Sequence, residues 1–372
     1  MAISNRWLPP VCVLVAALAA GCSAVTTSEP DPEPSVAERL RSDVADYLGD
    51  RTALDANVRA VVVTVGGDTL LEEYRDSSPD DYYNIASVTK SILGTLVGIA
   101  VDEGLLDLDA TLNDLLPQYA STMAPEVAAT TLHQLLTMTG PFPDTWYGSG
   151  ANGEHPDWVE ANLAAADRSP GTFAYSDPGV DVVAAVLAQA TGTTLVQYGR
   201  DKLFDPLEID TTPALEPLAA EENIPAYIDA GFAWPVDPKG IHLGASLMKL
   251  RAQDLVRVGR LYLDYGEWEG RQILSQEWIK AATTAQVAAP YGPSDHYGYL
   301  WWVHETGDGY DAFLAWGFAG QLLQVVPELD LVAVVQTEYD LLTASPLHPI
   351  ELTRLVDNVI LPAAEAAPVS ER

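Results

Sequence analysis

Apolar residues recur at two different spacings along the chain, and the two spacings predict helices and strands in different regions. A repeat of three or four residues predicts helices over residues 36–48, 88–103, 112–116, 132–138, 158–166, 178–191, 194–204, 252–264, 275–283 and 349–360. Short runs rich in β-branched and aromatic residues predict strands over residues 58–65, 69–74, 297–303, 312–316, 321–326 and 329–337. Residues 211–238 show neither spacing and are expected to be irregular.

Strands therefore lie near both ends of the chain, with helices between them. The first two strands are separated by Gly66-Gly67-Asp68, which predicts a hairpin. Because an isolated hairpin is not a stable sheet, we expect both groups of strands to pair into one antiparallel sheet. The result is an α+β fold whose sheet is flanked by the first and last helices. Residues 35–110 and 288–372 are expected to form the sheet subdomain, and residues 111–287 a mostly helical inserted subdomain.

One predicted helix has an unusual polar start. Between Asn84 and Gly104 the chain runs from polar residues into an almost uninterrupted apolar stretch, so this helix is expected to be buried. Ser87 lies in its first turn, and Lys90 follows three residues later. Residues three positions apart share a helix face, so the hydroxyl and the amine can touch. Gly104 fits the position just past the helix end.

Ser87 and Lys90 form the Ser-x-x-Lys pattern of an acyl-transfer nucleophile. Burial is expected to lower the pKa of Lys90, so that its amine can act as a base. The same pattern occurs in Ser246-Leu-Met-Lys249, which does not open an apolar helix. The alternative for Ser87 and Lys90 is a helix-start serine followed by a lysine on a solvated face, and the apolar residues after Lys90 argue against it.

A proton shuttle for this nucleophile is offered by Tyr175-Ser-Asp177, which lies just before a strongly predicted helix. A tyrosine beside a lysine ammonium is expected to have a lowered pKa and to act as a general base. The alternative for Tyr175 is a loop aromatic packed on the core. Asp177 has two interpretations: it contacts the substrate, or it is the N-cap of the following helix, with Pro178 at the first helical position.

A tetrahedral intermediate is stabilised by two backbone N–H groups aimed at one point. The N–H of Ser87 is one candidate. The second is expected from the stretch that begins with Ala315-Trp316-Gly317 and extends to Gln321, where glycine at a strand edge lets backbone approach a substrate closely. An ordinary hairpin turn is the alternative for this stretch.

Together, the segments around Ser87, Tyr175 and Gly317 resemble the serine β-lactamase and penicillin-binding-protein superfamily. The resemblance is to its class C β-lactamase-like branch, with its 6-aminohexanoate-oligomer hydrolases and related esterases, and it covers residues 57–360. It implies a β-lactamase-like fold, in which helices sandwich an antiparallel sheet and the active site lies beside an all-helical part. It also implies that Ser87 is acylated, that Lys90 activates it and that Tyr175 is the general acid/base.

The chain departs from this family's pattern in two places. Asp177 stands where the family usually has asparagine, and Ala315-Trp316-Gly317 stands where it usually has lysine or histidine before threonine and glycine. The missing cation predicts poor binding of substrates that carry a carboxylate, such as penicillins and peptide C-termini. Asp177 would instead attract a substrate ammonium group, as in 6-aminohexanoate-type amides.

Composition limits the classes of partner. Hydrophobic residues make up 48% of the chain, which is typical of a globular protein, and the formal net charge of −34 disfavours nucleic acid as a partner. The six histidines form no metal-ligand pattern, and neither a metal nor another cofactor is expected. The sequence leaves the oligomeric state open.

The first residues have the pattern of a secretory signal. Residues 1–21 combine a positive start at Arg6 with a short apolar stretch and small residues before Cys22. Leu18-Ala-Ala-Gly-Cys22 resembles a bacterial lipobox, which implies cleavage before Cys22 and a lipid anchor there. The alternative is an ordinary signal with an incidental cysteine. Residues 22–34 read as a flexible tether, and we expect an extracytoplasmic protein anchored to the cell membrane.

The sequence thus predicts a serine hydrolase that cleaves a small ester or amide through an acyl-Ser87 intermediate. The alternatives among enzymes are a D-alanyl-D-alanine carboxypeptidase and a β-lactamase. The alternative from another class is a catalytically silent surface binding protein with the same fold.

Overall fold

The computed structural model describes residues 34–51, 56–143, 155–339 and 350–366. The predicted signal, Cys22 and the tether up to residue 33 lie outside the described residues. Residues from 35 onward form one compact unit. The predicted division of this unit into a sheet subdomain and a helical subdomain stays a prediction.

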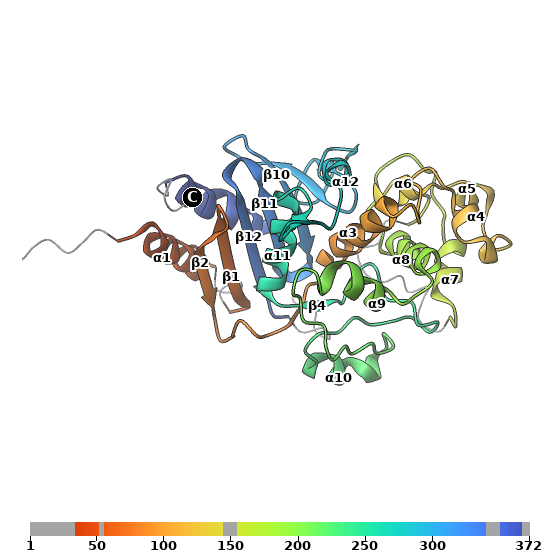
Figure 1. Cartoon of the computed structure of the whole chain (residues 1–372), viewed down its shortest axis with the longest axis horizontal. Helices are drawn as coiled ribbons and strands as arrows, with labels where there is room; N and C mark the ends of the chain where they lie inside the picture. Colours follow the sequence, from red (N-terminus) through yellow and green to blue (C-terminus); the bar gives the residue numbers. More distant parts are fainter. Residues whose placement is uncertain (1–33, 52–55, 144–154, 340–349, 367–372) are drawn as a thin grey trace, which may run out of the picture. The chain divides into compact units, whose positions relative to one another are not determined.

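Eight of the described strands form one antiparallel sheet in the order β2-β1-β12-β11-β10-β9-β8-β7 (Figure 1). The strands are β1 (Val58–Val65), β2 (Asp68–Tyr74), β7 (Val287–Ala288), β8 (His296–Tyr297), β9 (Trp302–Glu305), β10 (Asp311–Gly317), β11 (Gln321–Val326) and β12 (Leu331–Thr337). β1 pairs with β12, with Val62 opposite Val334. The strands from the two ends of the chain therefore meet in one sheet, as the sequence predicts.

Helices cover both faces of this sheet. Leu323 and Gln324 are consecutive in β11, so their side chains point to opposite faces. Leu323 lies against Gly259 of α11 (Ala252–Leu263), whereas the Gln324 amide donates a hydrogen bond of 2.9 Å to Asp357. Asp357 lies on η6 (Val356–Ile360), which packs with α1 (Val36–Gly49), α13 (Ile350–Leu355) and α14 (Leu361–Glu365). The first and last helices therefore share one face, as expected.

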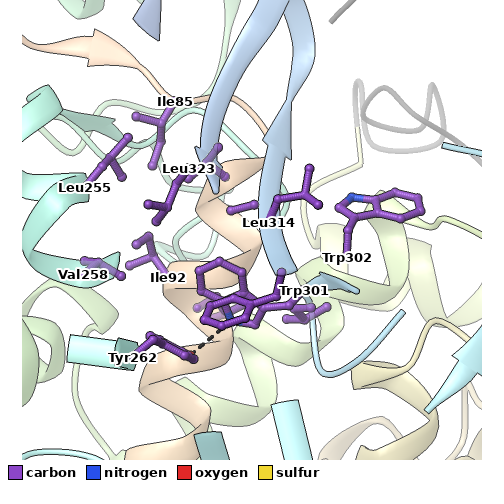
Figure 2. Packing of buried hydrophobic residues seen from close by; sticks show 14 of the residues in the cluster. Ile85, Ile92, Leu255, Val258, Tyr262, Trp301, Trp302, Leu314 and Leu323 are labelled. Atoms are coloured by element: carbon purple, nitrogen blue, oxygen red, sulfur yellow. Dashed lines mark hydrogen bonds between the residues drawn. The ribbon is translucent and has the colours of Figure 1, made fainter. Parts of the chain in front are cut away.

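The helix that begins after Ser87 is α3 (Val88–Asp102), and its residues 88–100 are all buried. It contacts β10 and β11 of the sheet, and Figure 2 shows Ile92 of α3 beside Val258 of α11 and Leu323 of β11. Below them, the Trp301 indole donates a 3.1 Å hydrogen bond to the Tyr262 hydroxyl. Gly104 has φ of +71° just past the helix, which confirms the predicted end. Tight packing on every side fixes the start of α3, where the candidate nucleophile lies.

The remaining helices lie mostly between α3 and the last strands in sequence. They are α4 (Leu112–Leu115), η1 (Pro117–Tyr119), α5 (Pro125–Ala128), α6 (Leu132–Leu136), α7 (Trp158–Ala164), α8 (Asp177–Thr191), α9 (Leu195–Gly199), η2 (Arg200–Phe204), η3 (Glu221–Asn223), α10 (Ile224–Asp229) and α12 (Gln276–Ala282). Two small ladders pair β3 (Tyr83–Asn84) with β4 (Lys249–Leu250) and β5 (Glu267–Trp268) with β6 (Arg271–Gln272). Across the described ranges, no single helix has the length and apolarity to cross a membrane. Taken together, α8 and α9–η2 are long and apolar enough by length and composition alone, but the chain bends by 74° between them.

Two of the predicted elements are wrong. Residues 297–303 were expected to form one strand, but Tyr297 pairs with Trp302 across a tight hairpin whose Leu300 has φ of +58°. Aromatic residues lie on both sides of this turn, so the sequence shows one continuous apolar run that cannot be told from a single strand. Residues 211–238 were expected to be irregular, yet they contain α10, whose single turn and a half is too short to show a period.

Candidate active site

The chain enters α3 through a constrained turn. The backbone N–H of Ala86 donates to the Asn84 side-chain oxygen at 2.9 Å, and Ala86 has φ of +47°, a left-handed conformation that costs a non-glycine residue energy. Ser87 follows as the N-cap of α3 and is partly exposed. Its side chain caps none of the described backbone N–H groups of the helix. The Ser87 hydroxyl is therefore presented at the surface of the turn and is available to other groups.

Lys90 lies one turn into α3, with 1% of its surface exposed. Its Nζ donates to Ser87 Oγ at 3.0 Å and to the Ala245 carbonyl oxygen at 2.6 Å. It also lies 2.7 Å from Asp177 Oδ1. Two hydrogen-bond acceptors and one ion-paired carboxylate therefore surround the amine. The predicted contact between Ser87 and Lys90 is present.

The pKa of Lys90 differs from the sequence expectation. Burial does favour the neutral amine and by itself lowers the pKa of Lys90, as expected. The charge of Asp177 and the neighbouring Tyr175 outweigh burial, so the pKa of Lys90 lies above its ordinary value. The expectation of a lowered pKa is wrong because Asp177 approaches from a helix far away in sequence. In the resting site, Lys90 is an ammonium ion.

Asp177 is not the N-cap of α8. Ser176 takes that position, and its hydroxyl accepts the N–H of Gly179 at 3.1 Å. Asp177 is the first residue of the helix, is 3% exposed and directs its carboxylate to Lys90. Burial raises the pKa of Asp177, and Lys90 offsets this in part. Since this carboxylate is enclosed and paired, it does not face a substrate ammonium group, and the sequence-based reason for amine-bearing substrates loses its support.

Tyr175 lies beside the same amine. The Lys90 Nζ is 4.9 Å from the centroid of the Tyr175 ring. The Trp302 ring stacks on the Tyr175 ring, with 5.6 Å between the two centroids. The backbone N–H of Tyr175 donates to the Tyr291 hydroxyl at 2.9 Å. Burial raises the pKa of Tyr175. The charge of Lys90 and a hydrogen bond with Ser87 act in the opposite direction, but they offset the effect of burial only in part. The expected lowered pKa is therefore wrong, and Tyr175 rests as a phenol.

The predicted third stretch reaches the site through its backbone at Gly317. A Cβ at Gly317 would lie 2.8 Å from the Ile85 carbonyl oxygen and 3.2 Å from Ala86 Cβ, directly before Ser87. Trp316 is partly buried, and its ring meets Trp302 edge-on at 6.1 Å. Ala315 is buried in β10. The end of β10 thus lies against the turn that presents Ser87.

Gln321 is not brought to this site. Its side chain is fully buried, and the amide donates to the Thr337 carbonyl oxygen at 2.7 Å and to Thr337 Oγ1 at 2.8 Å. These hydrogen bonds join β11 to β12, so the Gln321 amide has a structural role in the sheet. The position of Gln321 in the turn after Gly317 gave no sign of which way its side chain points.

The second Ser-x-x-Lys copy has a different environment. Lys249 Nζ donates to the carbonyl oxygens of Tyr227, Ile228 and Ala230, at and just after the C-terminal end of α10. A lysine on the last carbonyls of a helix is a structural contact. The Ser-x-x-Lys motif alone therefore does not distinguish the two copies. The hydrogen-bond acceptors do, because Lys90 contacts its serine whereas Lys249 contacts backbone carbonyls.

Sequence reasoning missed the segment that carries Ala245. Residues 245–250 run beside the entry to α3: the Ile85 N–H donates to the Met248 carbonyl at 2.9 Å, and the Met248 N–H donates to Thr89 Oγ1 at 3.2 Å. This alignment carries the Ala245 carbonyl to Lys90. Because any residue has a carbonyl, no side-chain pattern marks such a position.

Among the described residues, no group of three or more His, Cys, Asp or Glu side chains is placed to hold a metal ion. The polar groups close to Ser87 and Lys90 are a hydroxyl, an amine, a carboxylate and a phenol. Such a cluster can move a proton to and from a serine hydroxyl.

Comparison with known proteins agrees with this fold, which is that of a β-lactamase-fold hydrolase. The family model described as Beta-lactamase matches residues 51–351 of the 372-residue chain. The chain therefore belongs to the beta-lactamase family. This confirms the resemblance and the fold class inferred from the sequence.

Three similar proteins illustrate the range of the family. The chain is 26% identical over 299 residues to the 6-aminohexanoate-dimer hydrolase of Paenarthrobacter ureafaciens, covering 74% of this chain and 71% of that protein. It is 29% identical over 198 residues to the lovastatin esterase of Penicillium rubens, covering 46% and 49%. The crystal structure of a putative beta-lactamase from Bacteroides dorei superposes with a TM-score of 0.67 at 18% identity, covering 87% of this chain and 98% of that one.

Proposed function

We propose that the protein is a serine hydrolase that cleaves a small ester or amide through an acyl-Ser87 intermediate. The observation that carries the proposal is the position of Lys90 Nζ, 3.0 Å from Ser87 Oγ and 2.7 Å from Asp177 Oδ1. A partly exposed hydroxyl beside a fully enclosed amine and carboxylate is suited to nucleophilic attack. The hydrolase and esterase relatives support the same reaction class.

Proton transfer in this site begins from a protonated Lys90. The ammonium passes one proton to the Asp177 carboxylate, which gives a neutral amine and a neutral carboxyl group. The amine then takes the proton of Ser87 as Oγ forms its bond to the substrate carbonyl carbon, and the C=O π electrons move to the carbonyl oxygen to give the oxyanion of the tetrahedral intermediate. Burial penalises the charged pair more than the neutral pair, which lowers the energy needed for the first proton transfer.

Collapse of the tetrahedral intermediate requires a proton on the leaving group. Tyr175 is a phenol at rest and interacts with both Ser87 and Lys90, so it donates this proton and regains one from Lys90. Water then attacks the acyl-enzyme, and the same proton transfers run in the reverse order to release Ser87. The backbone N–H of Ser87 and one N–H near Gly317 are proposed to stabilise the oxyanion, a role supported by the close approach of Gly317 to residues 85 and 86.

Neutral substrates fit this site better than carboxylates. Trp302 stacks on Tyr175 and Trp316 lies edge-on to Trp302, and Ala315 stands where the family usually has its cation. Without a cationic partner, a desolvated substrate carboxylate loses roughly a hundredfold in specificity. This favours an esterase or amidase over the two alternatives, a D-alanyl-D-alanine carboxypeptidase and a β-lactamase.

The test is a comparison of kcat/KM on p-nitrophenyl butyrate, nitrocefin and a neutral anilide. Wild type is expected to prefer the butyrate over nitrocefin, with a burst of nitrophenol when deacylation is slow. Ser87→Ala should abolish turnover, and Ser246→Ala, in the second copy of the motif, should leave it unchanged. Preference for nitrocefin would support the β-lactamase alternative. Absence of turnover and of any burst on all three substrates would favour the silent binding protein.

The location of the protein is a separate proposal. We propose that it is extracytoplasmic and held at the cell membrane by lipid on Cys22, on the strength of the signal and the lipobox-like run before that cysteine. Cys22→Ser should release soluble protein from the membrane fraction of an expressing host. A wild-type protein that is already soluble and starts downstream of Cys22 would contradict the anchor.

A further inference from the structure

Asp181 lies one helical turn after Asp177 on α8, so both side chains project from the same face of that helix. Its Oδ1 accepts the backbone N–H groups of Gly244 at 3.0 Å and of Ala245 at 3.1 Å. The carbonyl oxygen of the same Ala245 accepts a hydrogen bond from Lys90 Nζ at 2.6 Å. One residue of backbone thus connects Asp181 to the lysine of the proposed active site.

The Gly244–Ala245 backbone has little room to move. A Cβ on Gly244 would lie 2.7 Å from Leu93 Cδ2 on α3 and 2.7 Å from the Val180 carbonyl oxygen on α8. Such distances exclude any side chain, so the segment is wedged between the two helices that carry Lys90 and Asp177. The remaining freedom of the segment is rotation of its peptide groups, and the two hydrogen bonds to Asp181 restrain this rotation.

We propose that Asp181 is a positioning residue for Lys90: its carboxylate orients the Gly244–Ala245 peptides, and the Ala245 carbonyl then holds the amine between Ser87 and Asp177. This inference rests on the proposed function, in which Lys90 transfers the proton of Ser87. An ionised acceptor binds N–H groups about twice as strongly as a neutral one. Acylation of Ser87 is therefore faster when Asp181 carries its charge.

The charge of Asp181 changes within the ordinary working range. Burial of the carboxyl group, followed by the charge of Asp177, raises the pKa of Asp181 to about 7, against the opposing hydrogen bonds from Ala245 and Gly244 and the charge of Lys90. Asp181 as a whole residue is partly exposed, although its carboxyl group is buried. Besides Asp177 on α8 and Lys90 on α3, the nearby titratable groups include His242, two residues before Gly244, which lies 3.0 Å from Glu216. Burial lowers the pKa of His242 to about 4, so it is neutral near pH 7.

The test is the second-order rate constant for acylation by a fluorophosphonate between pH 5.5 and 9. Wild type is expected to react faster as pH rises through an inflection near pH 7. Asp181→Asn keeps a carbonyl acceptor but cannot ionise, so it should lack the inflection and react roughly tenfold more slowly than wild type at high pH. Asp181→Glu keeps the charge on a longer side chain and should react slowly while retaining the inflection. If Asp181→Asn fails to fold by circular dichroism, Asp181→Glu decides the matter.

Asp237→Asn is the matched control. Asp237 also accepts two backbone N–H groups, from Lys239 at 2.8 Å and Ile241 at 2.9 Å, and it is 4% exposed. Its loop is not among the described contacts of Lys90, so Asp237→Asn should keep the wild-type profile. A full inflection in folded Asp181→Asn, its loss in Asp181→Glu, or its loss in Asp237→Asn would overturn the proposal. Equal labelling of Ser87→Ala would instead contradict the proposed function, whatever Asp181 does.

Discussion

Lys90 Nζ and Asp177 Oδ1 lie 2.7 Å apart in the buried centre of the site. Burial favours the neutral amine, and the charge of Asp177 is the main opposing influence that keeps the pKa of Lys90 high. Asp177→Asn removes that charge, so the pKa of Lys90 should fall, and the amine should be neutral at lower pH. The same change lowers the pKa of Asp181, which the Asp177 charge raises. The acidic limb of the acylation profile is therefore expected to move to lower pH.

The amide of Asp177→Asn still offers Lys90 an acceptor, so the rate on the alkaline plateau should stay within about tenfold of wild type. The measurement is the pH dependence of the p-nitrophenol burst with a p-nitrophenyl ester. Asp237→Asn again serves as the control, because it alters a buried carboxylate away from Lys90. An acidic limb that stays in place or moves to higher pH would show that the Asp177 charge governs neither the ionisation of Asp181 nor that of the amine.

In the proposed mechanism Lys90 and Tyr175 act on one proton path, so their substitutions should not be additive. Lys90→Ala and Tyr175→Phe should each lower kcat by roughly 10²- to 10⁴-fold, with a smaller change in KM, because proton transfer is required in the transition state. The double variant should be little slower than the slower single variant. Steady-state kinetics of the four proteins measure this coupling, and losses that multiply in full would separate the two residues.

Gly317 offers a test of the turn that presents Ser87. Gly317→Ala places a methyl group 2.8 Å from the Ile85 carbonyl oxygen, which is closer than real Cβ contacts come. The turn must shift, and kcat/KM should fall roughly tenfold to a hundredfold with the displaced nucleophile. Gly307→Ala is the control, since a Cβ there has no neighbour within 4 Å. If both variants keep wild-type kcat/KM, the end of β10 does not support the site.

Asp181 also predicts a trade between stability and activity. Its pKa is about 7 in the folded protein and about 3.9 in an unfolded chain, so the folded state binds the proton more tightly. Wild type therefore loses stability as pH rises from about 4 to about 7, whereas Asp181→Asn carries no ionisable group there and does not. Above pH 7 the variant should be more stable by on the order of 2 kcal/mol, allowing for solvent screening of a partly exposed residue.

Chemical denaturation at pH 4 and at pH 8 measures this difference. The two proteins should have similar free energies of unfolding at pH 4, and the variant should exceed wild type at pH 8. A variant that is less stable at pH 8 would mean that the lost charge-assisted bonds to Gly244 and Ala245 outweigh the cost of burying the charge.

The fold could be predicted from local patterns to a large degree. The apolar spacing of α3, the glycine after its end and the hairpin of β1 and β2 are all encoded within short stretches of sequence. The hairpin of β8 and β9 could not be predicted in this way, because aromatic residues fill both strands and the turn. A period-based argument cannot place a turn inside a continuous apolar run.

The sequence predicted which residues form the site better than it predicted their protonation chemistry. Ser87, Lys90 and Tyr175 are brought together as expected, yet the pKa directions of the lysine and the tyrosine were wrong. The direction for Tyr175 depends first on burial, and the direction for Lys90 depends on the charge of Asp177, which the packing of α8 against α3 brings close. Asp181 could have been suspected from its spacing of four residues after Asp177, which places both on one helix face.

The central claim is that Ser87 is the residue acylated by substrate, and intact-mass analysis with peptide mapping tests it most directly. After treatment with a fluorophosphonate, the wild-type protein is expected to gain the mass of a single adduct, on the peptide that contains Ser87. Ser246→Ala should gain the same adduct, and Ser87→Ala should gain none. An adduct on Ser246, or one that persists in Ser87→Ala, would contradict the account.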